Sequence, residues 1–314
     1  MVATVWLCPG QGAQKIGMAK DLAERFPEAR ATLDAIDRTL GFPLTTLMFE
    51  GPEDQLTATE NAQPAILAHS AAVFAVVGPR VDGAAAAAGH SLGEYSAYVA
   101  AGALSATDAA ALVRRRGELM QKAGAERPGT MAAVLGLATA EVEAACREAS
   151  SGGAVAVAAN LNGPDQTVIS GDPDAVAKAG ELCKARGAKR VVPLKVSGAF
   201  HSSLMAPAAN QLRVALEHAA FRDPAFPVIA NATAEPVRDA TRARRLLADQ
   251  LTAPVRWVAS MERAAELAGR GTAARFIEIG PGNVLAGLLR RIVPAASVTS
   301  LGTADEVARF LDAA

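Results

Sequence analysis

Residues 89–93, Gly-His-Ser-Leu-Gly, place a serine between two glycines in a G-x-S-x-G pattern. This pattern is typical of a sharp turn from a strand into a helix, where larger residues in place of the glycines would collide with neighbouring backbone. Such a turn exposes the hydroxyl of Ser91 as a nucleophile, and the N–H of Leu92 is then positioned to stabilise an oxyanion. Ser91 and Glu94 also have the spacing of a capping box, in which the serine only caps a helix. The motif alone is compatible with both interpretations.

A serine hydroxyl is a weak nucleophile without a base, and the chain has four histidines. His90 is adjacent to Ser91, so on an extended strand it points to the opposite face. His69 lies in an apolar segment, where a packed or surface histidine is the simpler interpretation. His218 comes late in an amphipathic helix and is expected in solvent. His201, in a loop after a predicted strand, is the candidate base, because a catalytic pair need not be close in sequence.

Residues 105–124 predict an amphipathic helix that starts at Ser105 and ends at Gly124. Arg116 falls within the apolar arc of this helix, whereas the two arginines before it fall outside. One interpretation is that Arg116 extends to water or pairs with a structural carboxylate. The other is that it presents a fixed guanidinium to an anionic substrate.

A glycine-rich loop, Pro-Gly-Gln-Gly-Ala-Gln at 9–14, follows a predicted strand at 2–8. Lys15 stands where a dinucleotide-binding fingerprint needs its third glycine, so that function is not predicted. Gly10 and Gly12 let the backbone approach a ligand closely, which leaves the N–H of Gln11 as a second candidate oxyanion donor.

The composition excludes several classes of protein. The chain has 314 residues with 31 Lys and Arg against 32 Asp and Glu, so its net charge of −1 does not favour nucleic-acid binding. Its three cysteines are too few and too scattered for a disulfide framework or a zinc site. No signal peptide or membrane span is predicted, since the apolar stretches are interrupted by Gly, Pro or charge. We expect a cytoplasmic protein that contacts neither membrane nor nucleic acid.

Strand-like runs alternate with amphipathic helices, which predicts an α/β fold with a mostly parallel sheet. The serine turn makes the large subdomain α/β-hydrolase-like, with residues 1–125 and 197–314. Between these segments, residues 126–196 predict the order β-α-β-β-α-β of an inserted ferredoxin-like small subdomain. The strand before Ser91, at 83–89, is unusual because it is almost entirely alanine, which prefers helix.

Six segments together resemble the malonyl-CoA:acyl carrier protein transacylase family, which belongs to the acyltransferases of fatty acid and polyketide synthesis. The resemblance covers essentially the whole chain, in the family's order and spacing. The segments are PGQGAQ, TENAQPAI, GHSLGEYSA, RRRGELMQ, GAFHSSLM and IGPGNVL.

The resemblance implies a role for each matching position. Ser91 would be the acylated nucleophile, His201 its base, and Arg116 the ligand of the malonyl carboxylate. The N–H groups of Gln11 and Leu92 would form the oxyanion hole. The remaining positions are Gln63, which would line the site, Gln250, whose backbone carbonyl would orient the histidine in place of an acid, and Phe200, which would favour malonyl over methylmalonyl groups.

The implied reaction is a ping-pong transfer of malonyl from malonyl-CoA to the phosphopantetheine thiol of an acyl carrier protein. No metal and no resident cofactor is implied, and a monomer is expected. Gly198 departs from the histidine common in the family, next to the residue that would select the acyl group. Alternatives within the family are a discrete polyketide acyltransferase or the acyltransferase subunit of malonate decarboxylase. A serine hydrolase such as a thioesterase and a catalytically silent docking module remain further alternatives.

Overall fold

The apolar run near the N-terminus forms strand β1 (Thr4–Cys8) in the computed structural model, which describes residues 3–269 and 274–313. β1 pairs in parallel with β2 (Ala84–Gly89) on one side and with β9 (Arg275–Ile279) on the other. The full sheet has the order β10-β9-β1-β2-β7-β8, and only the β7–β8 pair is antiparallel. The expected mostly parallel sheet is therefore present. The remaining strands of the sheet are β7 (Val228–Ile229), next to β2, and the edge strands β8 (Pro236–Val237) and β10 (Ser297–Leu301).

Helices cover both faces of this sheet, and alternate residues of β1 point into two separate cores. Trp6 and Cys8 belong to one core, while Val5 and Leu7 belong to the other. The helices around the sheet are α1 (Lys20–Arg25), α2 (Pro27–Leu40), α3 (Leu44–Glu50), α4 (Glu53–Thr57), α5 (Thr59–Val77), α6 (Gly93–Ala100), α7 (Ala106–Glu126), α10 (Ala206–His218), α11 (Ala240–Asp249), α12 (Trp257–Leu267), α13 (Val284–Ile292) and α14 (Ala304–Asp312).

The alanine-rich segment forms a strand despite its helical propensity. β2 lies between β1 and β7, and both α6 and α12 pack against it. Small side chains on a central strand let helices on both faces approach closely, so tertiary packing overrides the local preference. This strand ends at Gly89, two residues before Ser91.

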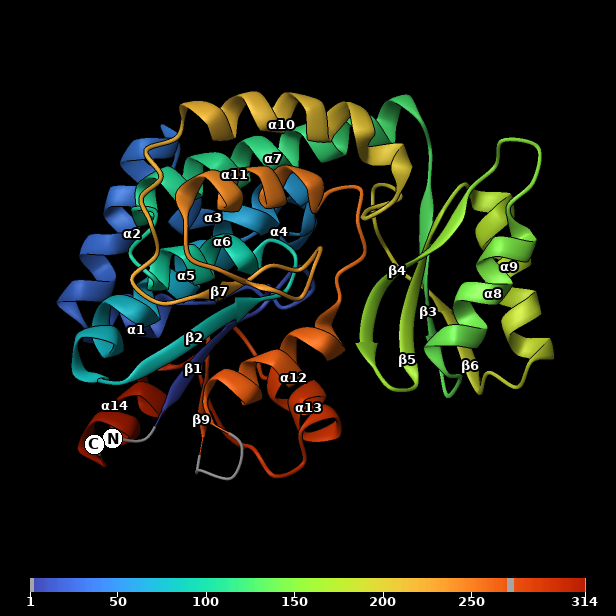
Figure 1. Ribbon diagram of the computed structural model, residues 1–314. Helices are drawn as coiled ribbons and strands as arrows, with labels where there is room; N and C mark the ends of the chain where they lie inside the picture. The colour runs from blue at the N-terminus through green and yellow to red at the C-terminus, as the bar shows by residue number, and fades with distance from the viewer. Residues whose placement is uncertain (1–2, 270–273, 314) are drawn as a thin grey trace.

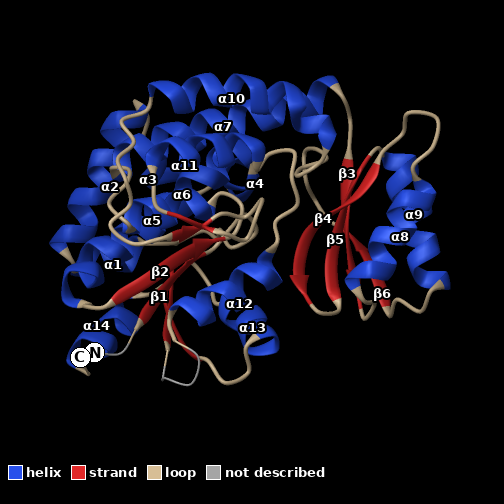
Figure 2. Ribbon diagram, in the orientation of Figure 1, coloured by secondary structure: helices blue, strands red, loops and turns tan. Residues whose placement is uncertain are grey.

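The middle of the chain, residues 130–193, forms a separate four-stranded antiparallel sheet with the order β4-β5-β3-β6. Its elements follow the predicted β-α-β-β-α-β sequence, including the expected β4–β5 hairpin. α8 and α9 cover the face of this sheet that points away from the large sheet (Figures 1 and 2). The elements are β3 (Thr130–Leu135), α8 (Thr139–Ala149), β4 (Ala156–Gly163), β5 (Gln166–Gly171), α9 (Pro173–Ala185) and β6 (Arg190–Pro193).

Two segments of the chain cross between the sheets, one near residues 124–129 and the other near residues 197–199. They pack closely against each other because glycines lie at the points of contact. A Cβ on Gly124 would lie 2.0 Å from the carbonyl oxygen of Ser197, and one on Gly129 would lie 2.8 Å from the nitrogen of Ala199. The prediction that Gly124 ends the helix is wrong, because α7 continues to Glu126. Gly124 is needed for the close packing of the last turn of α7 against the returning segment at Ser197, not for a helix terminus.

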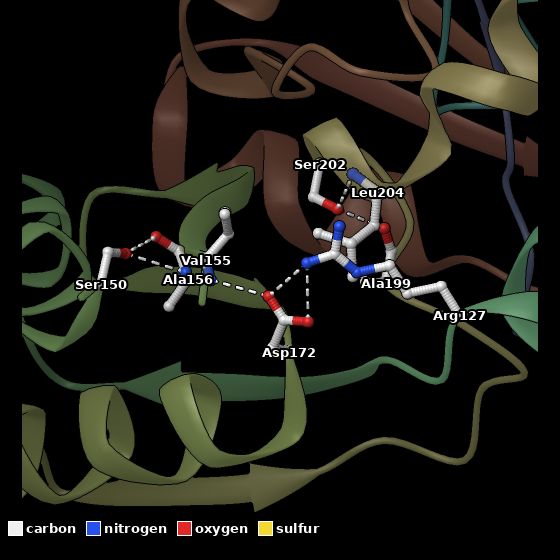
Figure 3. Close-up of polar contacts among 8 residues, drawn as sticks. All are labelled: Arg127, Ser150, Val155, Ala156, Asp172, Ala199, Ser202 and Leu204. Carbon is white, nitrogen blue, oxygen red and sulfur yellow. Dashed lines mark hydrogen bonds and ion pairs between the residues drawn. The ribbon is translucent and has the colours of Figure 1, made fainter. Parts of the chain in front are cut away.

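An ion pair fastens the first connection to the small sheet. Arg127, just after α7, places one guanidinium nitrogen 3.0 and 3.1 Å from the two carboxylate oxygens of Asp172 (Figure 3). Asp172 also accepts a 2.7 Å hydrogen bond from the N–H of Val155. Burial is the largest single effect on this carboxyl group and raises its pKa, but the hydrogen bonds from Val155 and Arg127 and the charge of Arg127 together hold the pKa below the usual value.

Among the described residues, one helix is long and apolar enough to cross a membrane by length and composition. This segment, Thr59–Arg80, contains an 18-residue window with a mean hydropathy of 1.3, and 78% of that window is buried inside the protein. Such burial is what a core helix of the large sheet requires.

Candidate active site

The serine turn has the geometry that its glycines predict. Ser91 adopts φ 53°, a left-handed conformation that non-glycine residues rarely occupy. A Cβ on Gly89 would lie 1.9 Å from the carbonyl oxygen of Gly93, and one on Gly93 would lie 2.2 Å from the carbonyl oxygen of Cys8. Both glycines are therefore obligatory for this turn.

The capping-box interpretation of Ser91 is wrong. Helix α6 begins at Gly93 and has no side-chain cap. Glu94 turns inward instead, where one carboxylate oxygen accepts hydrogen bonds from the N–H of Asn231 at 3.0 Å and the side-chain amide of Gln250 at 2.7 Å. The hydroxyl of Ser91 is thus available for other partners.

The chain brings His201 to Ser91 across 110 residues. The Nε2 atom of His201 lies 2.8 Å from the Oγ of Ser91, and its Nδ1 lies 2.9 Å from the backbone carbonyl of Gln250. Because a carbonyl only accepts, Nδ1 carries the hydrogen and Nε2 is free to accept the serine proton. This tautomer is the one that a general base requires.

A tight turn fixes the position of His201, which itself has φ 58°. The hydroxyl of Ser202 donates to the carbonyl of Ala199 at 2.7 Å and accepts from the N–H of Leu204 at 3.3 Å (Figure 3). Burial, and then the positive charge of Arg116, lower the pKa of His201 to about 3, although its bond to the Gln250 carbonyl acts in the opposite direction. The imidazole is therefore neutral at physiological pH.

The other three histidines lie as the sequence predicts. His90 turns away from Ser91, and its Nε2 is 2.8 Å from the Oδ1 of Asn162. His69 is packed in the core, with Nε2 2.9 Å from the Gly302 carbonyl, and His218 is exposed on α10.

Arg116 is buried on α7 and its guanidinium reaches the hydroxyl of Ser91. Its guanidinium donates to the Oε1 of Gln63 at 2.7 Å, the Oγ of Ser91 at 3.0 Å and the Oε1 of Gln250 at 2.9 Å. Only 1% of the residue is exposed, so it does not extend to water. In the described part of the chain it forms no ion pair with a carboxylate, and its Nε has no partner. Burial removes this cation from water and lowers its pKa. A buried cation of this kind is stabilised by binding an anion.

Gln63 lies behind Arg116 and is fully buried. It is not among the described residues that line the cavity above Ser91, so its contact with the site is through the guanidinium that it holds. The sequence places Gln63 on helix α5, but only the packing of α5 against α7 decides which residue it touches.

The two candidate oxyanion donors flank the serine. Gln11 lines the cavity together with Ser91, and Leu92 directly follows Ser91 in the chain. Within residues 3–269 and 274–313, neither backbone N–H donates a hydrogen bond to another protein group. Unpaired backbone donors beside a nucleophile are what a developing oxyanion requires.

The cavity has a volume of about 250 Å³ and lies between the two sheets. Ser91, His201 and Phe200 come from the large part, whereas Met131 and Asn160 come from the small one. Phe200 is 6% exposed and forms part of the cavity wall next to His201.

Sequence reasoning missed Asn231, which follows β7. Its Oδ1 accepts from the N–H of Ser91 at 2.7 Å, and its Nδ2 donates to the carbonyl of Gly89 at 2.7 Å. Asn231 is fully buried and holds both ends of the strained serine turn. An isolated asparagine in a loop carries no periodic pattern, so nothing in the sequence marks it.

The sequence from residue 5 to residue 308 matches the family model described as acyl transferase domain. The chain belongs to the acyl transferase family. It is 45% identical to the malonyl CoA-acyl carrier protein transacylase of Bacillus subtilis, over 93% of this chain and 91% of that protein. Its identity to the Escherichia coli protein of the same name is 40%, over 99% of this chain and all of that one. The resemblance stated from the motifs is confirmed.

Solved structures of the family have the same fold. An acyl carrier protein S-malonyltransferase from Vibrio cholerae superimposes with a TM-score of 0.92 at 39% identity, covering 98% of this chain and 99% of that one. A malonyl transacylase in complex with a type II polyketide synthase acyl carrier protein gives a TM-score of 0.93 at 40% identity, covering 99% and 100%.

Proposed function

We propose that this acyltransferase moves malonyl groups from malonyl-CoA to an acyl carrier protein through a malonyl-Ser91 intermediate. The contact of Ser91 Oγ with both His201 and Arg116 carries this proposal, because it joins a nucleophile, a neutral base and an unpaired cation within 3.0 Å. The names of the relatives support the substrate pair.

In the first half-reaction, Nε2 of His201 accepts the hydroxyl proton as Ser91 Oγ attacks the thioester carbonyl. The N–H groups of Gln11 and Leu92 hold the resulting oxyanion, and each such donor typically contributes about 2.7–4 kcal/mol to transition-state stabilisation. When the tetrahedral intermediate collapses, the C–S bond breaks and the imidazolium returns its proton to the CoA sulfur. Malonyl-Ser91 and CoA are the products.

In the second half-reaction, the phosphopantetheine thiol of the carrier protein gives its proton to His201 and attacks the acyl-serine. The C–O bond then breaks and Ser91 recovers its proton. The backbone carbonyl of Gln250 keeps the imidazole in the required tautomer throughout, in the position that an aspartate occupies in a catalytic triad.

Substrate selection is assigned to two residues. Arg116 holds the malonyl carboxylate, since a planar guanidinium matches a carboxylate in a bidentate pair. Phe200 occupies the space that an α-methyl group would need, which favours malonyl over methylmalonyl. Gly198 lies beside this ring, and a Cβ there would be 3.4 Å from it.

The subdomain boundaries, the cellular location and the oligomeric state are also proposals. We infer a hydrolase-like catalytic subdomain over residues 1–125 and 197–314, of which residues 1–2, 270–273 and 314 lie outside the described residues, and an inserted ferredoxin-like subdomain over 126–196. The order and directions of the small strands support the second name. We expect a cytoplasmic monomer without a resident metal or cofactor that serves fatty acid or polyketide synthesis.

Intact-protein mass spectrometry tests the proposal. After mixing with malonyl-CoA and no acceptor, we expect a malonyl adduct on the protein that is absent from Ser91→Ala and is discharged by a carrier protein bearing phosphopantetheine. Release of CoA without a lasting adduct would indicate a hydrolase instead. Absence of both adduct and CoA release would contradict the proposal.

A further inference from the structure

Glu94 is a buried carboxylate that the proposed reaction does not use. It is completely shielded from solvent at 0% exposure. Its Oε2 accepts two hydrogen bonds, whereas its Oε1 has no hydrogen-bond partner among the described residues. A charge is costly in such a place unless an opposite charge balances it.

The amide of Gln250 connects Glu94 to Arg116. Arginine only donates hydrogen bonds, so the amide oxygen of Gln250 must face Arg116, at 2.9 Å. The amide nitrogen then faces Glu94 Oε2, at 2.7 Å. This orientation aligns the amide dipole between a cation and an anion, so that Glu94 stabilises the guanidinium through Gln250 without touching it.

A malonyl carboxylate on Arg116 would change this balance, because one buried cation would then face two anions. The substrate carboxylate contacts the guanidinium directly and keeps its charge. The carboxyl group that must become neutral is the more distant one, and solvent supplies its proton. Oε1 is the atom that receives it, since Oε2 already accepts two hydrogen bonds.

We propose that Glu94 is a positioning residue that acts as the internal counter-anion of Arg116 and takes up a proton when malonyl binds to the guanidinium. This inference rests on the proposed function of the site. Burial raises the pKa of Glu94 to about 7, against the opposing effects of its two hydrogen bonds and of Arg116, so protonation at neutral pH is accessible.

Among the residues that the structure describes, no other group coupled to Glu94 is able to take up the proton at neutral pH. Burial raises the pKa of Tyr95 and Tyr98 on α6 and lowers the pKa of His90 and His201, so all four groups are neutral at pH 7. A charged pair at the start of α11 faces one of the tyrosines. Among the described residues, the titratable or charged groups that act on Glu94 or on the groups coupled to it are Arg116, Tyr95, Tyr98, His201, His90, Asp239 and Arg242.

Proton uptake on acylation tests the inference. Wild-type enzyme is mixed with malonyl-CoA at pH 7.5 in weak buffer with an indicator dye, and the same samples are analysed by intact mass. About three quarters of a carboxyl group with a pKa of about 7 is ionised at this pH, so we expect that fraction of a proton to be taken up per acylated Ser91. Released CoA offsets about a tenth of a proton, because its thiol ionises with a pKa near 8.5.

Two variants serve as controls. Glu94→Gln keeps an oxygen for both hydrogen bonds and removes the charge, so its acylation should proceed without uptake. Glu278→Gln removes another fully buried carboxylate, which caps α13 and has no contact with Ser91, His201 or Arg116, and its uptake should equal that of the wild type.

The outcomes separate the inference from the function on which it rests. Acylation of wild-type Ser91 without proton uptake would overturn the role of Glu94 and leave the transferase intact. Uptake that persists in acylated Glu94→Gln would overturn it as well. Absence of any acyl adduct on the wild type would overturn the proposed function and this inference together.

Discussion

Replacement of Asn231 by alanine should both destabilise the protein and slow its chemistry. The variant loses two hydrogen bonds of 2.7 Å, to the N–H of Ser91 and the carbonyl of Gly89, but keeps the backbone N–H that binds Glu94. An unsatisfied buried polar group costs about 1–3 kcal/mol. Ser91 borders the cavity, so water can replace Asn231 as the partner of the Ser91 N–H, whereas the Gly89 carbonyl stays unsatisfied. We therefore expect a total loss of about 2–4 kcal/mol in the free energy of unfolding.

The catalytic effect follows from the strain in the serine turn. Ser91 is held at φ 53°, and a non-glycine residue relaxes from this region at a gain of about 1–2 kcal/mol. Without Asn231 the turn is free to relax, which moves Oγ relative to His201. A displacement of about 1 Å lowers a rate by roughly 100-fold, so the burst of acylation by malonyl-CoA should slow by about that factor.

The matched control is Asn162→Ala. Asn162 is also a partner of the serine motif, but it contacts the side chain of His90 and not the backbone of the turn. Urea unfolding gives the stability of both variants, and stopped-flow acylation gives their rates. If Asn231→Ala matches Asn162→Ala in both measurements, Asn231 does not hold the turn.

Three other substitutions are expected to have separable effects. Arg116→Ala should reduce the malonyl-to-acetyl ratio of acylation rates by about 10- to 100-fold, since a charge-assisted hydrogen bond contributes about 1.5–3 kcal/mol; an unchanged ratio would exclude the carboxylate role. Phe200→Ser should raise kcat/KM for methylmalonyl-CoA relative to malonyl-CoA by about 10-fold or more, because space for one methyl is worth about 1–3 kcal/mol; equal selectivity in parent and variant would place selection elsewhere. Burial lowers the pKa of His69 to about 4, so the unfolded chain binds its proton first as the pH falls below 6.5. The stability of wild type relative to His69→Asn should therefore fall by about 1.4 kcal/mol per pH unit between pH 6.5 and 4, as measured by urea unfolding, and a pH-independent difference would refute this assignment.

The local part of the site could be predicted because its constraints are steric and short in range. Gly89 and Gly93 are each needed within two residues of Ser91, and the neighbouring backbone leaves no space for a side chain. The helical period of α7 likewise placed Arg116 in the core, where the structure has it. His201 followed from elimination among four histidines, and the family resemblance added Gln250.

Other local patterns led to wrong predictions where distant segments supplied the partners. Ser91 and Glu94 have the spacing of a capping box, but Glu94 binds Asn231 and Gln250 instead. Gly124 has the residue type of a helix end, but it is a packing contact with Ser197. By contrast, the strand predicted before Ser91 is confirmed as β2, because the strands and helices around it override the helical preference of its alanines.

The sequence by itself determined the elements, the serine turn and the residue types of the chemistry, because these depend on periodicity and on sterics between near neighbours. Only the tertiary structure decided which groups meet: the hydroxyl of Ser91 with His201 and Arg116, and its backbone with Asn231 from 140 residues away. Contacts between loops that are far apart in the sequence depend on where the strands of the sheet place those loops. Such contacts leave no local periodicity, so a single sequence does not reveal them. For this reason the buried path from Glu94 through Gln250 to Arg116 emerged only when the chain was folded.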